Sequence, residues 1–170
     1  IMEFGALQCV PKNPNCEACI LSNSCAALQH KKVALLPIKS KKTKVTPKYF
    51  NYLIIQDQEE KFVVQKREGK GIWENLYEFT LIETDKLTDE ISFVDQLKMT
   101  HFFGQKATDI CVLSTEVVQH KLSHQHLYIR FYGVKLDQKI PQAKPLEAIK
   151  KLPFPIVIYN FMQSSCFNSL

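Results

Sequence analysis

Runs of β-branched and aromatic residues separated by polar segments make up most of the chain, and such runs are typical of strands. Residues 48–56 and 61–67 flank the polar segment DQEE and predict a hairpin. Residues 69–83 continue in strand style after two glycines that permit a tight loop. Residues 108–122 and 125–136 predict further strands, the second with one hydrophobic face. Its alternating positions are Leu127, Ile129 and Phe131 against Tyr128, Arg130 and Tyr132.

Residues 88–103 change to a helical spacing of hydrophobic positions. Thr88 is expected as the N-cap of this helix and Gly104 as its stop. Residues 145–152 and 155–167 also predict helices, the second starting at a proline. The order of strands, helix, strands and helices predicts an α+β, or mixed α/β, domain. The hydrophobic stripe expected on the first helix consists of Ile91, Val94, Leu97 and Phe102.

Length and composition allow one core and a small appendage, because the chain has 170 residues of which 45% are hydrophobic. Residues 1–28 form a cysteine-rich piece that opens like the last turns of an amphipathic helix, so we expect the chain to be part of a longer protein. Residues 29–47 predict a basic linker, and residues 48–170 a folded domain. Trp73 is expected to anchor the core of the sheet. The other aromatic residues expected there are Tyr49, Phe50, Tyr52, Tyr77 and Phe79.

The net charge of +5 arises in one segment of the chain. No acidic residue occurs between Glu17 and Asp57, whereas seven lysines do. Two interpretations stay open: a solvated linker, or a segment that neutralises a nucleic-acid backbone. The seven lysines are Lys31, Lys32, Lys39, Lys41, Lys42, Lys44 and Lys48.

Four cysteines lie close together near the start of the chain, in the pattern C-x6-C-x2-C-x5-C. No run of about 18 apolar residues and no export signal occur, so we expect an intracellular protein, whose thiols stay reduced. Four thiolates can hold a zinc ion or a 4Fe-4S cluster, but zinc sites usually have two separated C-x2-C pairs and only Cys16 and Cys19 form one. The two other cysteines, expected as buried structural thiols, are Cys111 and Cys166.

This cysteine spacing after a helix resembles the 4Fe-4S loop of the endonuclease III superfamily of DNA glycosylases. The segment QKREGKGIWENLYEFTLIE, residues 65–83, resembles the core of the C-terminal domain of the MutY family of A/G-mismatch adenine glycosylases. HKLSHQHLYIRF, residues 120–131, resembles the H-x-F-S-H segment of the same domain. The resemblance implies a Nudix-like fold, with a mixed sheet and flanking helices after a small iron-sulfur loop. It also implies a 4Fe-4S cluster on Cys9, Cys16, Cys19 and Cys25.

A Nudix-like fold raises a second possible function, the hydrolysis of an oxidised nucleotide. A Nudix hydrolase holds divalent metal with an R-E-x-x-E-E motif on a helix, and this motif does not occur in the sequence. We therefore expect recognition rather than hydrolysis. By resemblance, the parent enzyme removes adenine mispaired with 8-oxoguanine or guanine, using residues in upstream domains. No catalytic residue is assigned in this chain, and alone it is expected to be inactive.

The resemblance assigns 8-oxoguanine recognition to Leu122, Ser123 and His124. In 8-oxoguanine N7 carries a hydrogen, so a reader must offer an acceptor there, as the Ser123 hydroxyl can. His124 is expected to position the loop or to contact the DNA backbone. Leu122 stands where the family usually has Phe, so it is either an apolar wedge or only a packing residue. Ser123 read without the resemblance is an ordinary turn residue.

Contacts with the DNA backbone are expected at Lys12, Lys41, Lys42 and Lys44, although Lys12 can equally be a solvated loop residue. The expected partner is double-stranded DNA with A:8-oxoG or A:G mispairs, and repair or clamp proteins are further candidates through the linker. We expect a monomer in the bacterial cytoplasm, without membrane association. Two alternatives stay open: a Nudix-type nucleotide hydrolase and a zinc-bearing nucleic-acid adaptor.

Overall fold

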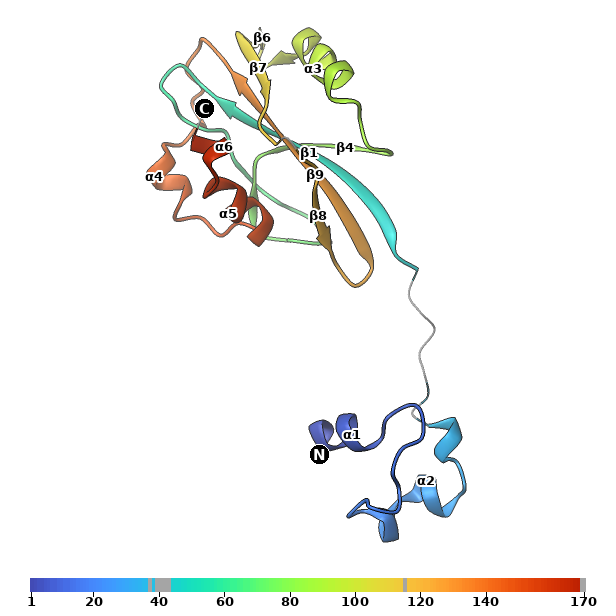
Figure 1. The fold of residues 1–170 in the computed structure, drawn as a ribbon. Helices are drawn as coiled ribbons and strands as arrows, with labels where there is room; N and C mark the ends of the chain where they lie inside the picture. Colours follow the sequence, from blue (N-terminus) through green and yellow to red (C-terminus); the bar gives the residue numbers. More distant parts are fainter. Residues whose placement is uncertain (37, 39–43, 115, 169–170) are drawn as a thin grey trace. The chain divides into compact units, whose positions relative to one another are not determined.

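The structure is a computed structural model that describes residues 1–170 except 37, 39–43, 115 and 169–170 (Figure 1). Its contacts divide the chain into two compact units, Ile1–Thr43 and Lys44–Leu170. The first unit begins with the helix that the sequence predicts, and its remaining elements are single turns. Its elements are α1 (Met2–Gln8), η1 (Ser22–Ser24), α2 (Ala26–Gln29) and η2 (Val33–Leu35).

The second unit is built around a mixed sheet in the order β4-β1-β9-β7, with β8 also paired to β9. The two long central strands, β1 (Thr46–Gln56) and β9 (Gln125–Lys135), run parallel, with Thr46 beside Gln125 and Gln56 beside Lys135. The sheet is completed by β4 (Thr80–Thr84), β7 (Asp109–Val112) and β8 (Val118–Lys121). Two small ribbons pair β2 (Gln65–Lys66) with β3 (Tyr77–Glu78), and β5 (His101–Phe102) with β6 (Gln105–Lys106).

Helices cover both faces of this sheet (Figure 1). On one face, Phe131 of β9 stacks on Phe161 of α5 with ring centroids 3.7 Å apart. On the other face, Tyr132 of β9 packs on Phe93 of α3 at 4.9 Å. The predicted hydrophobic positions of β9 are fully buried, and Tyr132 is buried as well because α3 covers the second face. The helices are α3 (Glu90–Met99), α4 (Leu146–Ile149), α5 (Ile156–Met162) and α6 (Ser165–Asn168).

The predicted hairpin between residues 48–56 and 61–67 forms at its turn, but the second run does not continue as a long strand beside β1. The chain does turn back after β1, but the only bridge between these runs in the described part of the chain joins Gln56 and Phe62. One edge of β1 is occupied by β9 along its whole length and the other by β4 from Tyr49 to Leu53, so the second run pairs only with the last residues of β1. It continues instead into β2, which pairs with β3.

The predicted helix exists, but its boundaries and buried face differ from the prediction. Asp89, not Thr88, is the N-cap, and its carboxylate accepts the Ser92 N–H at 3.0 Å. The helix buries Phe93 and Leu97, whereas Ile91 is 75% exposed. Phe102 lies beyond the helix in β5, so the stripe that we predicted combined two elements. An aromatic ring four residues before Leu97 defines the true face.

Trp73 lies at the edge of the core rather than at its centre, and is half-buried against it. Of the other aromatic residues expected in the core, three are buried, while Tyr49 and Tyr77 are half-buried. Cys111 and Cys166 are also half-buried, and desolvation raises the pKa of the Cys111 thiol. The buried aromatic residues are Phe50, Tyr52 and Phe79.

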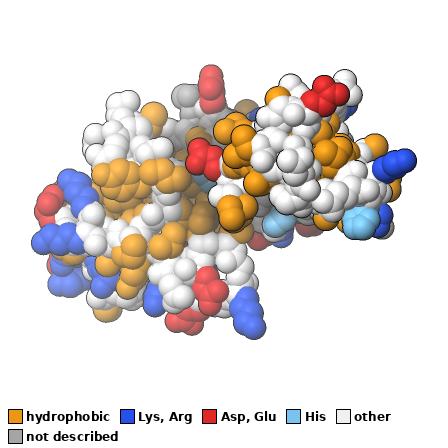
Figure 2. All heavy atoms as spheres, turned by 90° about the horizontal axis from the view of Figure 1, so that it is seen from below, with side chains coloured by type: hydrophobic (Ala, Val, Ile, Leu, Met, Phe, Trp, Pro, Cys, Tyr) orange, Lys and Arg blue, Asp and Glu red, His pale blue; other side chains and the backbone are white. Residues whose placement is uncertain are grey.

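The surface is mixed, with hydrophobic side chains lying between charges of both signs (Figure 2). Exposed hydrophobic residues include Ile20 and Leu35 of the first unit and Ile156 of the second. Among the residues that the structure describes, no helix is long and apolar enough to cross a membrane.

Candidate nucleic-acid interface

The three residues predicted to recognise a damaged base form the turn between β8 and β9. The Leu122 N–H donates to the Gln125 carbonyl at 2.8 Å and closes this turn. Ser123 and His124 are exposed at its tip, whereas Leu122 is half-buried and packs against the core. The turn therefore presents a serine hydroxyl to the surroundings while its first residue is held from beneath. We refer to residues 122–124 as the recognition turn.

The recognition turn is also held by the strand on its other side. Because β1 and β9 are parallel and start together, the first residue of β1 lies beside the turn. The Thr46 N–H donates to the His124 carbonyl at 3.1 Å, and the Thr46 hydroxyl donates to the same oxygen at 3.4 Å. Lys44, two residues earlier, is exposed. The chain therefore enters the second unit, beginning with Lys44, at the end that carries the turn.

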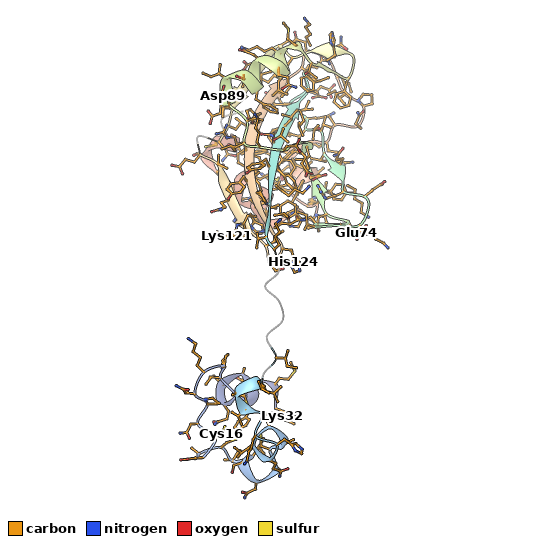
Figure 3. All side chains as sticks on the ribbon, turned by 90° about the vertical axis from the view of Figure 1, so that its right-hand side faces the viewer. Cys16, Lys32, Glu74, Asp89, Lys121 and His124 are labelled. Atoms are coloured by element: carbon orange, nitrogen blue, oxygen red, sulfur yellow. The ribbon has the colours of Figure 1, made fainter. Side chains whose placement is uncertain are left out.

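The same end of the domain carries polar residues that the sequence analysis did not assign. Lys121 is exposed directly before the turn and lies with His124 and Glu74 at one end of the domain, with Asp89 at the other (Figure 3). The neighbouring Tyr128 accepts a hydrogen bond from the Gln119 side chain at 3.2 Å and stacks on another tyrosine, Tyr49, at 5.2 Å. The alternation of side chains along one strand does not predict pairs from different strands, such as Tyr49 and Tyr128. These pairs follow only from the register between the strands.

The other three predicted backbone contacts belong to the first unit. Lys12 is exposed, but it belongs to the first unit. Lys41 and Lys42 lie outside the described residues. Of the four predicted lysines, Lys44 is the one that belongs to the second unit.

The four clustered cysteines of the first unit surround one cavity of about 180 Å³. Three of them are half-buried and Cys9 is exposed. Val10, Leu28 and Val33 also line the cavity, so its wall is mainly apolar. Within the described ranges, no three His, Cys, Asp or Glu side chains are arranged to hold a single metal ion. Thiol side chains are the donors that zinc and iron-sulfur clusters use. The four cysteines are Cys9, Cys16, Cys19 and Cys25.

A buried ion pair fixes the segment that resembles adenine glycosylases to the central sheet. The Glu78 carboxylate accepts a hydrogen bond from Arg67 at 2.7 Å and one from the Tyr52 hydroxyl at 3.1 Å. Burial raises the pKa of Tyr52, and the nearby Glu78 charge raises it further. Arg67 also lies over the Phe50 ring at 5.7 Å. These contacts attach the β2–β3 ribbon to β1, and the role of this network is structural.

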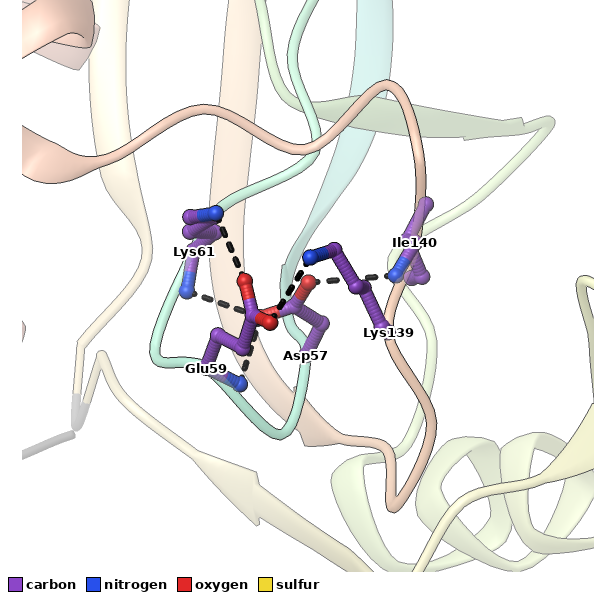
Figure 4. Close-up of polar contacts among 5 residues, drawn as sticks. All are labelled: Asp57, Glu59, Lys61, Lys139 and Ile140. Atoms are coloured by element: carbon purple, nitrogen blue, oxygen red, sulfur yellow. Dashed lines mark hydrogen bonds and ion pairs between the residues drawn. The ribbon is translucent and has the colours of Figure 1, made fainter.

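The acidic residues that follow β1 are likewise engaged in structural contacts (Figure 4). The Asp57 carboxylate accepts the N–H groups of Glu59 and Lys61 at 2.9 Å and that of Ile140 at 3.1 Å. Glu59 pairs with Lys61 at 2.6 Å and with Lys139 at 2.9 Å. These hydrogen bonds, first the one from Lys61, lower the pKa of Glu59 to about 2. These contacts hold the loop after β1 against the segment that follows β9.

Comparison with known proteins agrees with this architecture. The chain belongs to the NUDIX domain family, whose profile matches residues 51–164. In sequence it is similar to adenine DNA glycosylases: it is 33% identical over 129 residues to that of Buchnera aphidicola subsp. Schizaphis graminum and 28% identical over 129 residues to that of Buchnera aphidicola subsp. Baizongia pistaciae. Each alignment covers 76% of this chain and 34% of the relative, so the chain spans about a third of their length.

A solved structure also shows the same fold. The C-terminal domain of mouse MUTYH, determined in complex with human PCNA, matches with a TM-score of 0.52 and 15% identity. The match covers 72% of this chain and 88% of that domain. It confirms the predicted Nudix-like mixed α/β fold, and the sequence relatives confirm the resemblance to the C-terminal part of adenine DNA glycosylases.

Proposed function

We propose that this chain is the DNA-recognition part of an adenine DNA glycosylase and that its recognition turn reads 8-oxoguanine opposite the target adenine. The observation that carries the proposal is the exposed Ser123 at the tip of a turn held from both sides. A group fixed in this way loses little conformational entropy when it binds. The similarity to adenine DNA glycosylases supplies the class of substrate.

The chemistry of the lesion suits a serine acceptor. Guanine offers an acceptor at N7, whereas 8-oxoguanine offers an N–H donor there and an additional oxygen at C8. The Ser123 hydroxyl can accept from N7–H, and backbone N–H groups of the recognition turn can donate to the oxygen. A hydrogen bond made to the lesion and not to guanine contributes about 1–3 kcal/mol of discrimination. His124 positions the turn, and the half-buried Leu122 serves more as packing than as a wedge.

Lysines near the turn supply attraction to DNA that does not depend on sequence. Lys121 is exposed at the end of the domain that carries the turn (Figure 3), and Lys44 is exposed two residues before Thr46, which binds the turn. Each lysine that neutralises a phosphate adds about 0.9 to the slope of log affinity against log salt. Lys12, Lys41 and Lys42 are proposed to act in the same way, and double-stranded DNA with A:8-oxoG or A:G mispairs is the proposed partner.

For the first unit we propose a 4Fe-4S cluster held by Cys9, Cys16, Cys19 and Cys25. Its support is the cavity that the four thiols line together, and their spacing along the sequence. When bound, the cluster would brace the loop that carries Lys12. The cysteines act as ligands only, since base removal requires groups that this chain is not proposed to contain.

The carboxylates of α3 and their ion pairs do not favour the nucleotide-hydrolase alternative. Such an enzyme holds its metal with several carboxylates, and α3 carries only Glu90 and Asp95. Arg130 pairs with Glu90 at 3.1 Å and Lys98 with Asp95 at 3.0 Å.

A protein partner is a separate proposal. The mouse domain was solved in complex with PCNA, and we propose a clamp protein as a candidate partner for residues 29–47.

The decisive experiment measures binding of the chain to duplexes with 8-oxoguanine or guanine opposite an adenine analogue. We expect Ser123→Ala to reduce the preference for 8-oxoguanine by roughly 5- to 150-fold, which corresponds to the loss of about 1–3 kcal/mol. Ser165→Ala, at an exposed serine of α6, is the matched control and should leave the preference unchanged. Equal affinity of the unaltered chain for both duplexes would refute the proposed function.

A further inference from the structure

We propose that Trp73 is a positioning residue that sets the orientation of the recognition turn through His120. This inference rests on the proposed function, and it adds a specificity-determining contact from a different part of the chain. Trp73 lies in the loop between β2 and β3, about fifty residues before the turn. Three observations support it: the backbone of the loop, the contacts of the ring, and the way in which β8 is held.

The backbone of the β2–β3 loop is constrained at Trp73. Trp73 has φ +61° and Asn75 φ +67°, a region that side chains other than glycine rarely occupy. Two backbone hydrogen bonds hold this arrangement. The Asn75 N–H donates to the Arg67 carbonyl at 3.0 Å, and the Leu76 N–H donates to the Trp73 carbonyl at 3.1 Å. Such conformations persist only where the surroundings enforce them, and they cluster at functional sites. Here the constraint determines where the indole ring points.

The indole ring connects the core to β8. It meets the buried Phe50 ring edge-on, with ring centroids 6.2 Å apart. It also packs on the His120 ring, with centroids 5.8 Å apart and an angle of 49° between the ring planes. Phe50 is only 2% exposed, so the close packing of the core restricts movement of its ring. Trp73 therefore transmits the position of the rigid core to a half-buried residue of β8.

His120 in turn determines the position of the recognition turn. His120 is half-buried against Trp73, and Leu122, the first residue of the turn, packs against the same core. β8 has only four residues and pairs with β9 through the four positions from Val118 to Lys121. A hairpin held by so short a ladder can twist about β9. The Trp73 ring under His120 opposes this twist and so fixes the direction in which Ser123 points.

The test compares Trp73→Leu with the conservative Trp73→Phe. Phe93→Leu is the matched control, because it removes a core ring from the opposite face of the sheet. The first readout is NMR of the free chain, through the ¹⁵N chemical shifts and order parameters of residues 120–124. The second is the ratio of affinities for 8-oxoguanine and guanine duplexes.

Trp73→Leu should shift the signals of residues 120–124 and lower the affinity ratio by about 2-fold or more, the range expected for residues in contact. Trp73→Phe should keep the NMR signals and the affinity ratio close to those of the unaltered chain. Phe93→Leu should lower thermal stability without changing the signals of residues 120–124 or the affinity ratio. Unchanged signals at residues 120–124 in Trp73→Leu would overturn the inference. Shifted signals together with no lesion preference in the unaltered chain would instead refute the proposed function while the positioning contact stands.

Discussion

Ser123 illustrates how much the neighbourhood of a single residue decides. The same serine in a mobile loop would offer an acceptor in no defined direction, and binding would cost it conformational entropy. Here the carbonyl of the next residue, His124, is bound by Thr46, and the N–H of the preceding residue, Leu122, is bound within the turn. The hydroxyl is therefore presented by two fixed neighbours.

Glu59 gives a residue-scale prediction about pH. Its pKa is lowered from an ordinary value of 4.5 to about 2 by Lys61 and Lys139. A lowered pKa means that the ionised form stabilises the fold above pH 4.5, and that this contribution is lost as the pH falls toward 2. Glu59→Gln should therefore lower the thermal midpoint slightly at neutral pH and flatten its dependence on pH in that acidic interval.

The control for this prediction is Glu68→Gln, because Glu68 is an exposed glutamate in the loop between β2 and β3. The measurement is thermal unfolding of both variants at a series of pH values. An acid profile for Glu59→Gln that follows the unaltered protein would contradict the assignment of these ion pairs.

At the scale of elements, α3 shows how a helix can be predicted with one wrong residue on its buried face. The hydrophobic spacing located the helix, but Ile91 and Phe93 competed for the inward position. Phe93 prevails because its ring fits against Tyr132, and Ile91 is left exposed. A periodic pattern with two possible phases cannot be resolved without the partner surface.

This assignment predicts very different effects for two substitutions in one helix. Leu97→Ala should lower the free energy of unfolding by about 2–5 kcal/mol, because Leu97 is 1% exposed and its loss leaves a cavity. Ile91→Ala should change it by less than about 0.5 kcal/mol, because this side chain is 75% exposed. Denaturant unfolding of both variants measures the difference, and similar losses would mean that the helix is rotated.

At the scale of the whole molecule, the chain joins a unit of short helices and four clustered cysteines to a larger α/β unit. The two units depend on different physics. The second has two hydrophobic layers, whereas the described residues of the first contain no buried position in any of its helices. A unit without a core requires another source of stability, and a metal group is a common one in small domains.

We therefore expect the purified chain, isolated without oxygen, to contain iron and sulfide and to absorb broadly in the visible region. Cys16→Ser should reduce the iron content and expose the first unit to proteolysis, because a ligand and the bracing that it supports are lost. Cys111→Ser, outside the cluster, is the control and should retain the iron. Stoichiometric zinc without iron would favour the zinc-bearing adaptor instead.

The sequence by itself determined the class of fold and the spacing of the cysteines, whereas residues 122–124 were assigned by the resemblance to adenine glycosylases. These features depend on local chemistry: strand alternation, turn residues and the spacing of ligands along a short loop. It did not determine the partners of β1, the buried face of α3 or the place of Trp73 at the core's edge.

Only the tertiary structure decided those features, because each depends on a surface supplied by residues distant in the chain. Thr46 meets His124 and Trp73 meets His120 only after β1 and β9 have paired and the β2–β3 loop has closed over them. Contacts of this kind follow from strand register and packing, which no local pattern specifies.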